Sequence, residues 1–312
     1  MSIESLIFYV GAFLLLGFGS SMVLQSVSHL TSKIHASRLS ISFLLLGVLT
    51  SIPELALGLS AVSRNEPEIF VGNLIGGSAI LILLVIPLLA LTGKGLSFPS
   101  SINKKLLALT LVVCMTPSLF VIDRQITTIE SLSMIGFFAV LTLAIQVRGG
   151  IMEKKTQTLI HSRSFSLLDL AKIVGGVVVI FVSSNIILTK THELSVLFHI
   201  PDLVTSILIL SFGTNLPEIS LAVKSVISKK QDIALGDYLG SASANTLIFG
   251  VLSLFLGGTY SIQDGLLANF FILGVGSLLF YQFAKSKWSI SAREAGVLLI
   301  LYVGYLLYWI AQ

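Results

Sequence analysis

The stretch TSIPE at residues 50–54 recurs as TNLPE at residues 214–218, and both copies lie inside apolar segments of the chain. A second piece follows each copy, GNLIG at 72–76 and GDYLG at 236–240, and all the matches share one offset of 164 residues. A glutamate inside a bilayer is energetically costly, and a proline beside it removes a helix hydrogen bond. Because this costly pair occurs twice at one offset, we predict a duplicated cation site at mid-depth in a membrane.

The composition is that of a polytopic membrane protein rather than of a soluble globular one. Of the 312 residues, 54% are hydrophobic and 11% are charged, and the mean hydropathy is +0.97. The first apolar segment follows a start without Lys or Arg, so we expect it to be a span rather than a cleavable signal peptide. The single cysteine, Cys114, offers no disulfide. The net charge of +4 is small, and we expect no nucleic-acid partner.

Windows of about 20 apolar residues predict an all-α polytopic membrane protein with ten transmembrane helices. The windows lie at residues 5–27, 39–62, 69–92, 104–122, 127–147, 168–189, 203–227, 233–257, 266–284 and 290–310. They divide the chain into a first five-helix repeat (1–147), a polar linker (148–167) and a second five-helix repeat (168–312). With an even number of spans, both termini lie on the same side of the membrane.

The Lys and Arg residues predict which side that is. Sixteen lie in loops opposite the termini, and three, Arg64, Arg124 and Lys190, lie on the side of the termini. Cytoplasmic loops carry the excess of Lys and Arg, so we predict both termini outside, the linker inside, and a location in the plasma (cytoplasmic) membrane. The spans at 39–62 and 203–227 then cross in opposite directions. The halves become inverted-topology repeats, with a substrate site expected between them near the midplane.

Thr50, Pro53 and Glu54 lie in the middle of the second predicted span. Pro53 has no backbone N–H and disfavours helix at the residue before it, so nearby carbonyl oxygens lose their partners. A hard cation can replace those partners at membrane depth, and Glu54 adds a carboxylate. The second copy supplies the same three residues, Thr214, Pro217 and Glu218. Two carboxylates and two carbonyls suit Ca²⁺, whereas zinc or copper is disfavoured because no His or Cys lies near the motifs. The alternative is that the prolines only kink the helices and each glutamate is protonated or bonded to a neighbour.

Polar residues also follow one face of the predicted span at 233–257. Asp237, Ser241 and Asn245 are spaced at i, i+4 and i+8. The second half thus keeps a polar stripe that the first half has partly lost. The equivalent positions of the span at 69–92 are Asn73, Gly77 and Leu81. Pairs of glycines four residues apart in both spans predict close helix packing.

These residues together resemble the calcium/cation antiporter superfamily, and most of all its sodium/calcium exchanger branch. Members have ten helices in two inverted halves, each with a repeat reading G-T-S-x-P-E and then G-N-x-x-G-S-N-x-x-N/D, which is similar to residues 47–81 and 211–245 here. The resemblance implies that Ca²⁺ is held by Glu54 and Glu218 with carbonyls of Thr50 and Thr214. It also implies sodium sites completed by Ser51, Asn215, Ser241 and Asn245.

The chain departs from the family pattern at a few positions. The first repeat has Leu49 in place of the glycine of Gly-Thr-Ser, and Gly77 and Leu81 in place of the serine and of the Asn or Asp. The second repeat has Asp237 in place of the asparagine of Gly-Asn. Gly77 and Leu81 remove polar atoms that a sodium site would use, whereas the residues implied for calcium remain. Calcium binding is therefore better supported than sodium coupling.

Three functions follow from these residues. Two carboxylates neutralise one Ca²⁺ or two Na⁺, so a shared site predicts a secondary antiporter that exports Ca²⁺ in exchange for Na⁺ by alternating access. Proton coupling is the alternative, because neighbouring carboxylates affect each other's titration and Asp237 adds a third such group. A channel or a non-transporting membrane protein is the third, but only two spans carry a duplicated mid-depth carboxylate. We expect no enzymatic activity and no cofactor, with Ca²⁺, Na⁺ or H⁺ and the lipid bilayer as partners.

Overall fold

A computed structural model describes residues 3–31, 43, 47–93, 95–98, 102–152, 167–220, 222, 231–257, 259–262 and 266–311 of the chain. Most of the predicted linker at 148–167 lies outside the described residues. So do many of the basic residues assigned to the cytoplasmic side, among them Lys33, Arg38, Lys94, Lys154, Lys155, Arg163, Lys224, Lys229 and Lys230.

Helix occurs in every predicted apolar window. The helices of the first half are α1 (Ile3–Thr31), α3 (Gly47–Thr50), α4 (Ile52–Ser63), α5 (Pro67–Ile80), the π-helix η2 (Leu81–Val85), α6 (Ile86–Thr92), α7 (Lys104–Phe120) and α8 (Thr128–Met152). Those of the second half are α9 (Leu167–Phe198), α10 (Asp202–Thr205), the π-helix η3 (Ser206–Leu210), α11 (Ser211–Thr214), α13 (Gln231–Phe255), α14 (Leu267–Lys287) and α15 (Ala292–Ile310). Within the described ranges, seven helices are long and apolar enough to cross a membrane, and Ile52–Ser63 and Asp202–Thr214 are shorter apolar helical segments. The predicted all-α membrane class agrees with these helices.

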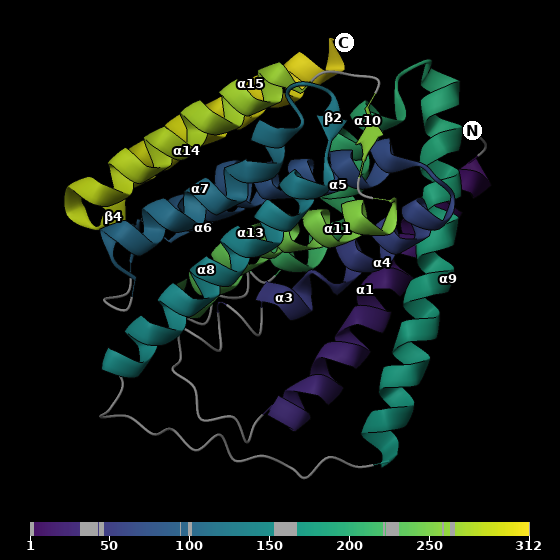
Figure 1. Ribbon diagram of the computed structural model, residues 1–312, viewed down its shortest axis with the longest axis horizontal. Coiled ribbons are helices and arrows are strands. Elements are labelled where there is room, and N and C mark those ends of the chain that lie inside the picture. Colours follow the sequence, from purple (N-terminus) through teal and green to yellow (C-terminus); the bar gives the residue numbers. More distant parts are fainter. Residues whose placement is uncertain are drawn as a thin grey trace.

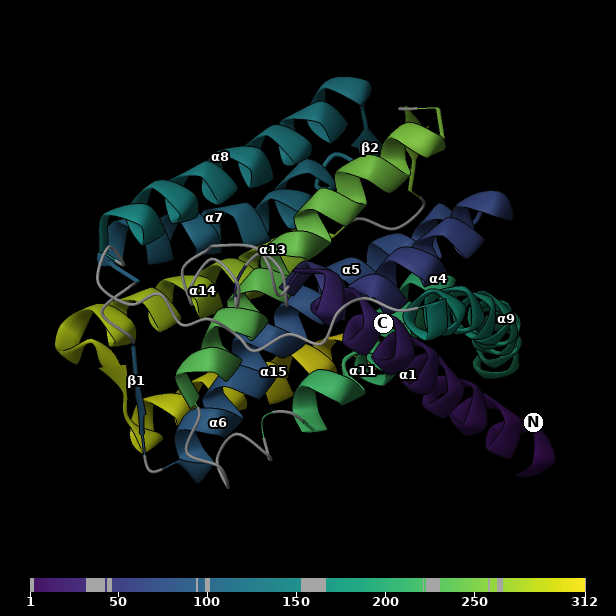
Figure 2. The same cartoon turned by 90° about the horizontal axis from the view of Figure 1, so that it is seen from below.

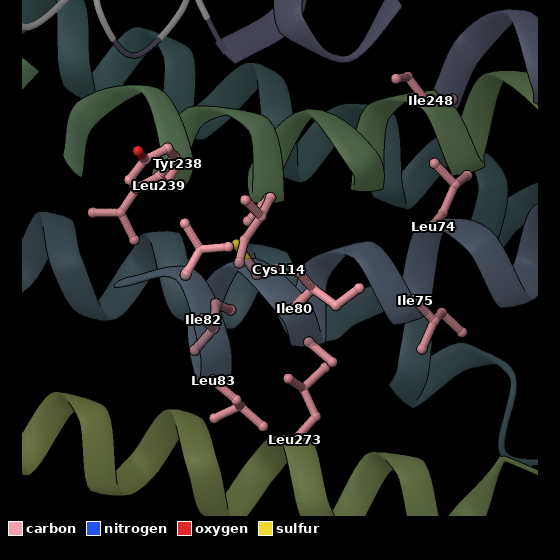
Figure 3. Close-up of a cluster of buried hydrophobic side chains, with 14 of the residues drawn as sticks. Leu74, Ile75, Ile80, Ile82, Leu83, Cys114, Tyr238, Leu239, Ile248 and Leu273 are labelled. Carbon is pink, nitrogen blue, oxygen red and sulfur yellow. The ribbon is translucent and has the colours of Figure 1, made fainter. Parts of the chain in front are cut away.

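The helices form a buried centre and a periphery with many exposed apolar side chains. The continuous segment of α5, η2 and α6 is almost wholly buried, and it packs against α13. Figure 3 shows the apolar side chains between these elements, with Leu83 of η2 lying opposite Leu273 of α14. Helices α1 and α9 pack along each other at one edge of the molecule (Figures 1 and 2), and their outward apolar side chains, such as Phe8, are exposed. This distribution suits a protein whose outer surface contacts lipid.

The π-helix η2 has a local cause, and α9 differs from its predicted window in length. The π-helix η2 lies directly ahead of Pro87, whose ring would clash with the carbonyl of Leu83 in an unbroken α-helix. Helix α9 has 32 residues and extends well past the predicted window of 168–189. At about 1.5 Å per residue it exceeds a hydrocarbon core of about 30 Å, so its last turns extend past the apolar region.

Two short strand pairs, which were not expected from the sequence, join loops at the ends of the helices. Strand β1 (Leu96–Ser97) pairs antiparallel with β4 (Ser289–Ile290), and β2 (Gln125–Ile126) pairs antiparallel with β3 (Tyr260–Ser261). Leu96 lies opposite Ile290, and Ile126 lies opposite Tyr260. Adding 164 to 96 gives 260, and subtracting 164 from 290 gives 126. The offset of 164 residues therefore also relates the two strand pairs. Each strand of one pair is equivalent to a strand of the other pair that lies in the opposite half of the chain.

Candidate cation-binding site

The helix is interrupted directly ahead of Glu54. Helix α3 ends at Thr50, Ser51 is non-helical with φ −84° and ψ 11°, and α4 begins at Ile52 with Pro53 in its first turn. Proline is tolerated there because the first N–H groups of a helix have no intrahelical partner. Glu54 is 1% exposed and lies in this first turn, where the helix dipole favours a negative charge. Pro53 therefore sets the start of a helix instead of kinking one.

The second copy of the motif has the same local backbone. Helix α11 ends at Thr214, and Asn215 has φ −89° and ψ 8°, close to the angles of Ser51. The carbonyls of Ser51 and Asn215 each accept a hydrogen bond from the backbone N–H four residues later, at 3.0 Å in both cases. Glu218 is buried to the same degree as Glu54. Both copies thus present a buried glutamate directly after a helix break.

Each site threonine contacts a polar residue of the other half. The hydroxyl of Thr50 has two acceptors, each at 3.3 Å, which are Asp237 Oδ1 and the Gly47 carbonyl. The hydroxyl of Thr214 likewise has Asn73 Oδ1 and the Ser211 carbonyl, each at 3.2 Å. Residues 50 and 214 are equivalent at the offset of 164, as are residues 73 and 237. The two halves therefore meet through two equivalent contacts, in each of which a threonine of one half faces a polar residue of the other. We call these the crossed contacts.

The next pair of crossed contacts is unequal. The hydroxyls of Ser51 and Ser241 share a hydrogen bond of 2.9 Å. At the equivalent pair, a Cβ added to Gly77 would lie 3.1 Å from the amide nitrogen of Asn215, and also 3.1 Å from that of Asn245. Two amides thus occupy the space beside Gly77, where the family pattern has serine. Leu81 is fully buried in the apolar core at the start of η2.

The predicted close packing is confirmed for Gly72, Gly76 and Gly240. A Cβ on Gly47 would lie 2.5 Å from the carbonyl carbon of Gly240, and a Cβ on Gly76 would lie 2.7 Å from Ser211 Oγ. These two contacts are again equivalent at the offset of 164. Because Gly47, Gly240 and Gly76 have no side chains, α13 can approach α3 and α5 can approach α11 closely enough to bring the two motifs together.

Several buried oxygen atoms at the site have no hydrogen-bond partner among the residues that the structure describes. They are Glu54 Oε2, both carboxylate oxygens of Glu218, Asp237 Oδ2, Asn215 Oδ1 and Asn245 Oδ1. An unsatisfied buried polar group costs about 1–3 kcal/mol, and more when charged. A bound cation can satisfy such oxygen atoms, and oxygen ligands suit Ca²⁺ and Na⁺.

The three carboxylates influence one another without forming a single ready-made ligand set. The charges of Glu54 and Asp237 both repel that of Glu218. Within the described part of the chain, no group of three or more His, Cys, Asp or Glu side chains is arranged to hold one metal ion. Hydroxyl, amide and backbone oxygens would therefore have to complete any coordination shell. The structure brings together all the residues of the predicted site, which are Thr50, Ser51, Glu54, Thr214, Asn215, Glu218, Asp237, Ser241 and Asn245.

A family model described as "Sodium/calcium exchanger protein" matches residues 4–147 and 169–311. The chain belongs to the sodium/calcium exchanger family. This match confirms the predicted superfamily. It also confirms the prediction that the chain is an integral membrane protein and a cation antiporter rather than an enzyme. The unmatched residues between the two segments, 148–168, include the predicted linker at 148–167.

Two relatives of this exchanger-family chain align over nearly its full length, and a third aligns over less than half of it. It is 24% identical to the putative antiporter CaxA of Alkalimonas amylolytica over 309 residues, which cover 96% of each chain. It is 27% identical to the uncharacterized membrane protein MJ0091 of Methanocaldococcus jannaschii over 308 residues, 96% and 97% of the two chains. The sodium/calcium exchanger MaX1 of Methanosarcina acetivorans is 29% identical over 142 residues, 44% of this chain and 39% of that one.

Two solved exchangers have the same fold. The sodium-calcium exchanger NCX_Mj, soaked with Na⁺ and Sr²⁺, matches with a TM-score of 0.67 and 21% identity over 97% of this chain and 98% of that chain. The H⁺/Ca²⁺ exchanger CAX matches with a TM-score of 0.78 and 14% identity over 97% and 82%. At these identities the likeness shows the fold alone.

A polar contact that sequence reasoning missed lies at the end of α4. The guanidinium of Arg64 donates to Asn185 Oδ1 at 2.9 Å, to the Asn185 carbonyl at 3.1 Å and to the Thr189 hydroxyl at 3.1 Å, and so ties α4 to α9. Burial raises the pKa of the neighbouring Glu66, against the opposing charges of Arg64 and His192. The only signal in the sequence was that Arg64 is one of three basic residues on the predicted outer side.

Proposed function

We propose that this protein is a secondary active antiporter that exports Ca²⁺ from the cytoplasm in exchange for Na⁺. The observation that carries the proposal is the set of buried oxygens, where the two halves cross, that have no hydrogen-bond partner among the described residues. Glu54 and Glu218 would supply the charge for Ca²⁺, with carbonyl oxygens of Thr50 and Thr214. Ser51, Asn215, Ser241 and Asn245 would serve Na⁺, and Asp237 adds a third carboxylate.

Exchange follows from mutual exclusion at a shared site. The two glutamates balance one Ca²⁺ or two Na⁺, so the ions compete for the same oxygens. A buried carboxylate without a counter-ion is costly, which disfavours reorientation of the unloaded protein. Alternating access then couples the outward passage of Ca²⁺ to the inward passage of Na⁺ down its gradient.

The proposed topology is ten membrane-spanning helices in two inverted repeats, 1–147 and 168–312, joined by a cytoplasmic linker at 148–167. The strand pairs support it. The topology puts β1 and β4 in cytoplasmic loops and β2 and β3 in outer loops. One missed or surplus span between paired loops would separate the members of a pair by a bilayer, and they could not hydrogen-bond.

The crossed contacts and the two equivalent helix breaks support the inverted relation of the halves. The start of α1 and the end of α15 both lie in the upper part of Figure 1. An even number of spans would put both termini on one side of the membrane. We propose that this end faces the outside of the plasma (cytoplasmic) membrane, because the excess of Lys and Arg lies on the opposite side.

Proton coupling is the second candidate. It is favoured by the third carboxylate, Asp237, and by Gly77 and Leu81, which remove two polar side chains from the sodium side of the site. The fold is shared with an H⁺/Ca²⁺ exchanger as well as with a sodium-calcium exchanger.

The deciding experiment is ⁴⁵Ca²⁺ uptake into proteoliposomes with an imposed Na⁺ gradient at equal pH, and then with a pH gradient without Na⁺. We expect uptake to follow the Na⁺ gradient. Uptake that follows only the pH gradient would show that Ca²⁺ transport is coupled to H⁺ instead of Na⁺. No uptake under either gradient would contradict calcium antiport altogether.

A further inference from the structure

We propose that a phospholipid with an anionic headgroup binds where α7 begins and where α14 passes into α15. Five exposed basic residues mark this place, which we call the basic corner. They are Lys104 and Lys105 at the start of α7, Lys285 and Lys287 at the end of α14, and Arg293 at the start of α15. The proposed topology puts the basic corner on the cytoplasmic side of the membrane. The inference goes beyond calcium antiport and does not depend on which ions are exchanged.

Helix packing brings these basic residues together. Helices α7 and α14 pack against each other in opposite directions, and a Cβ on Gly274 of α14 would lie 3.0 Å from Met115 Cε of α7. Eleven residues before Met115 is Lys104, and eleven residues after Gly274 is Lys285. The two lysines therefore lie at one level, at the same edge of the molecule in Figures 1 and 2. The pairing of β1 with β4 joins the segment ahead of α7 to the start of α15.

The equivalent corner of the other half has the same backbone without these charges. Trp288 and Arg124 are equivalent at the offset of 164, and both have left-handed backbone angles, with φ 56° and 65°. The Trp288 carbonyl accepts from the Phe98 N–H at 3.0 Å, and the Arg124 carbonyl accepts from the equivalent Ile262 N–H at 2.9 Å. The residues equivalent to the five basic ones are Ala268, Asn269, Val121, Asp123 and Ile129. The backbone of the corner therefore does not require the basic residues.

The positive charge of the basic corner is not neutralised within the described part of the chain. The ion pairs there lie at the end of α9 and the start of α10, and none includes one of the five basic residues. The corner has one carboxylate, Glu294, whose Oε2 accepts from the Ser291 N–H and hydroxyl at 2.7 Å each. Five positive charges and one negative charge leave +4. Lys and Arg bind phosphate groups, so an anionic headgroup suits this charge.

An exposed apolar stripe on α14 favours a lipid over a soluble anion. Phe271, Val275 and Leu278 are exposed and are spaced by three or four residues, so they share one face of the helix. Lys285 lies seven residues after Leu278 on the same face, and its Nζ is 5.9 Å from the centre of the Tyr281 ring. Acyl chains would lie along this stripe, which places the headgroup at the lysines.

Trp288 provides the measurement, because its ring lies at the basic corner, 5.3 Å from that of Phe98. The change Trp309→Phe leaves Trp288 as the single tryptophan. This protein is reconstituted without Ca²⁺ into phosphatidylcholine vesicles with a minor fraction of phosphatidylglycerol. Dibrominated acyl chains, which quench indole fluorescence, are carried by one lipid or by the other. We expect phosphatidylglycerol to bind beside Trp288 about tenfold more tightly than phosphatidylcholine, since each basic residue near a membrane surface contributes about fivefold.

Two sets of substitutions separate charge from packing. Lys104→Gln, Lys105→Gln, Lys285→Gln and Lys287→Gln together should lower the ratio of the two binding constants to about one. Arginine at the same four positions should keep the preference for phosphatidylglycerol. All four lysines are exposed, so we expect both variants to fold, and size-exclusion profiles of the purified proteins check this.

The equivalent corner supplies a matched control. Arg124→Trp, combined with Trp288→Phe and Trp309→Phe, places the single tryptophan at the equivalent left-handed position. We expect no preference for phosphatidylglycerol at this second reporter, because the charged cluster is missing there.

Four outcomes overturn the inference. They are a ratio near one at Trp288, a preference that survives the four glutamines in a folded protein, and an equal preference at the equivalent corner, which would indicate general attraction of anionic lipid. The fourth is loss of the preference when soluble glycerol phosphate is added, which would assign the corner to a free phosphate. None of these measurements uses Ca²⁺ transport, so they leave the proposed antiport untouched.

Discussion

At the scale of single residues, the two glutamates differ from every other described carboxylate in being duplicated, buried and placed directly after a helix break. We predict that Glu54→Gln or Glu218→Gln abolishes Ca²⁺ transport while the protein stays folded. Each change leaves a divalent ion one charge short, and loss of one partner of a buried charge pair costs about 3–5 kcal/mol. The measurement is ⁴⁵Ca²⁺ uptake, with Glu193→Gln on the exposed end of α9 as the control. Near-normal uptake in either variant would exclude the proposed calcium site.

The contrast between Gly77 and Ser241 leads to a second prediction at this scale. Gly77→Ser combined with Leu81→Asn should strengthen the dependence of transport on Na⁺, because it restores the polar stripe of the first half. A side chain at residue 77 must displace the amides of Asn215 and Asn245 by a few tenths of an ångström, and an amide at residue 81 enters the apolar core. The Na⁺ affinity of the purified, folded double variant is the measurement. If it is unchanged or lower, the asymmetry of the halves has another cause than sodium.

At the scale of helices, the approach of α3 to α13 depends on Gly47. We predict that Gly47→Ala destabilises the protein by about 1–3 kcal/mol, the usual cost of overpacking, because the added Cβ would lie 2.5 Å from the backbone of Gly240. Gly11→Ala on α1 is the matched control. Its Cβ meets no atom within 4 Å, and alanine in a helix is favoured over glycine by about 0.5–1 kcal/mol. Thermal unfolding in detergent compares the two. Equal melting temperatures would show that this helix contact is not tight.

At the scale of the whole molecule, the proposed topology is tested by accessibility. Tags at both termini should be reached from outside the cell, and a protease site placed near Lys154 should be cut only from the cytoplasm. The reason is the division of Lys and Arg, sixteen to three, which an even number of spans turns into one choice of orientation. Termini on opposite sides would require an odd number of spans, and the inverted halves would have to be abandoned.

The sequence by itself determined the membrane class and the family, and it predicted the helical windows and the residues of the candidate site. These follow from local signals: runs of apolar residues, a proline beside a glutamate, and a repeat at one offset. Apolar length and backbone chemistry act over a few residues, so they can be read along the chain. The exact start of α4 at Ile52 and the length of α9 were not determined in this way, because helix ends depend on what the next segment contacts.

Only the tertiary structure decided which residues of one half meet which residues of the other. The contacts of Thr50 with Asp237, of Ser51 with Ser241 and of Gly47 with Gly240 join residues almost 200 positions apart. The two-residue strands were likewise too short to leave a periodic pattern in the sequence. Such contacts arise from the packing of whole helices against each other, and no local propensity encodes them. The unequal charges at the crossed threonine contacts therefore became visible only when both halves were placed in one structure.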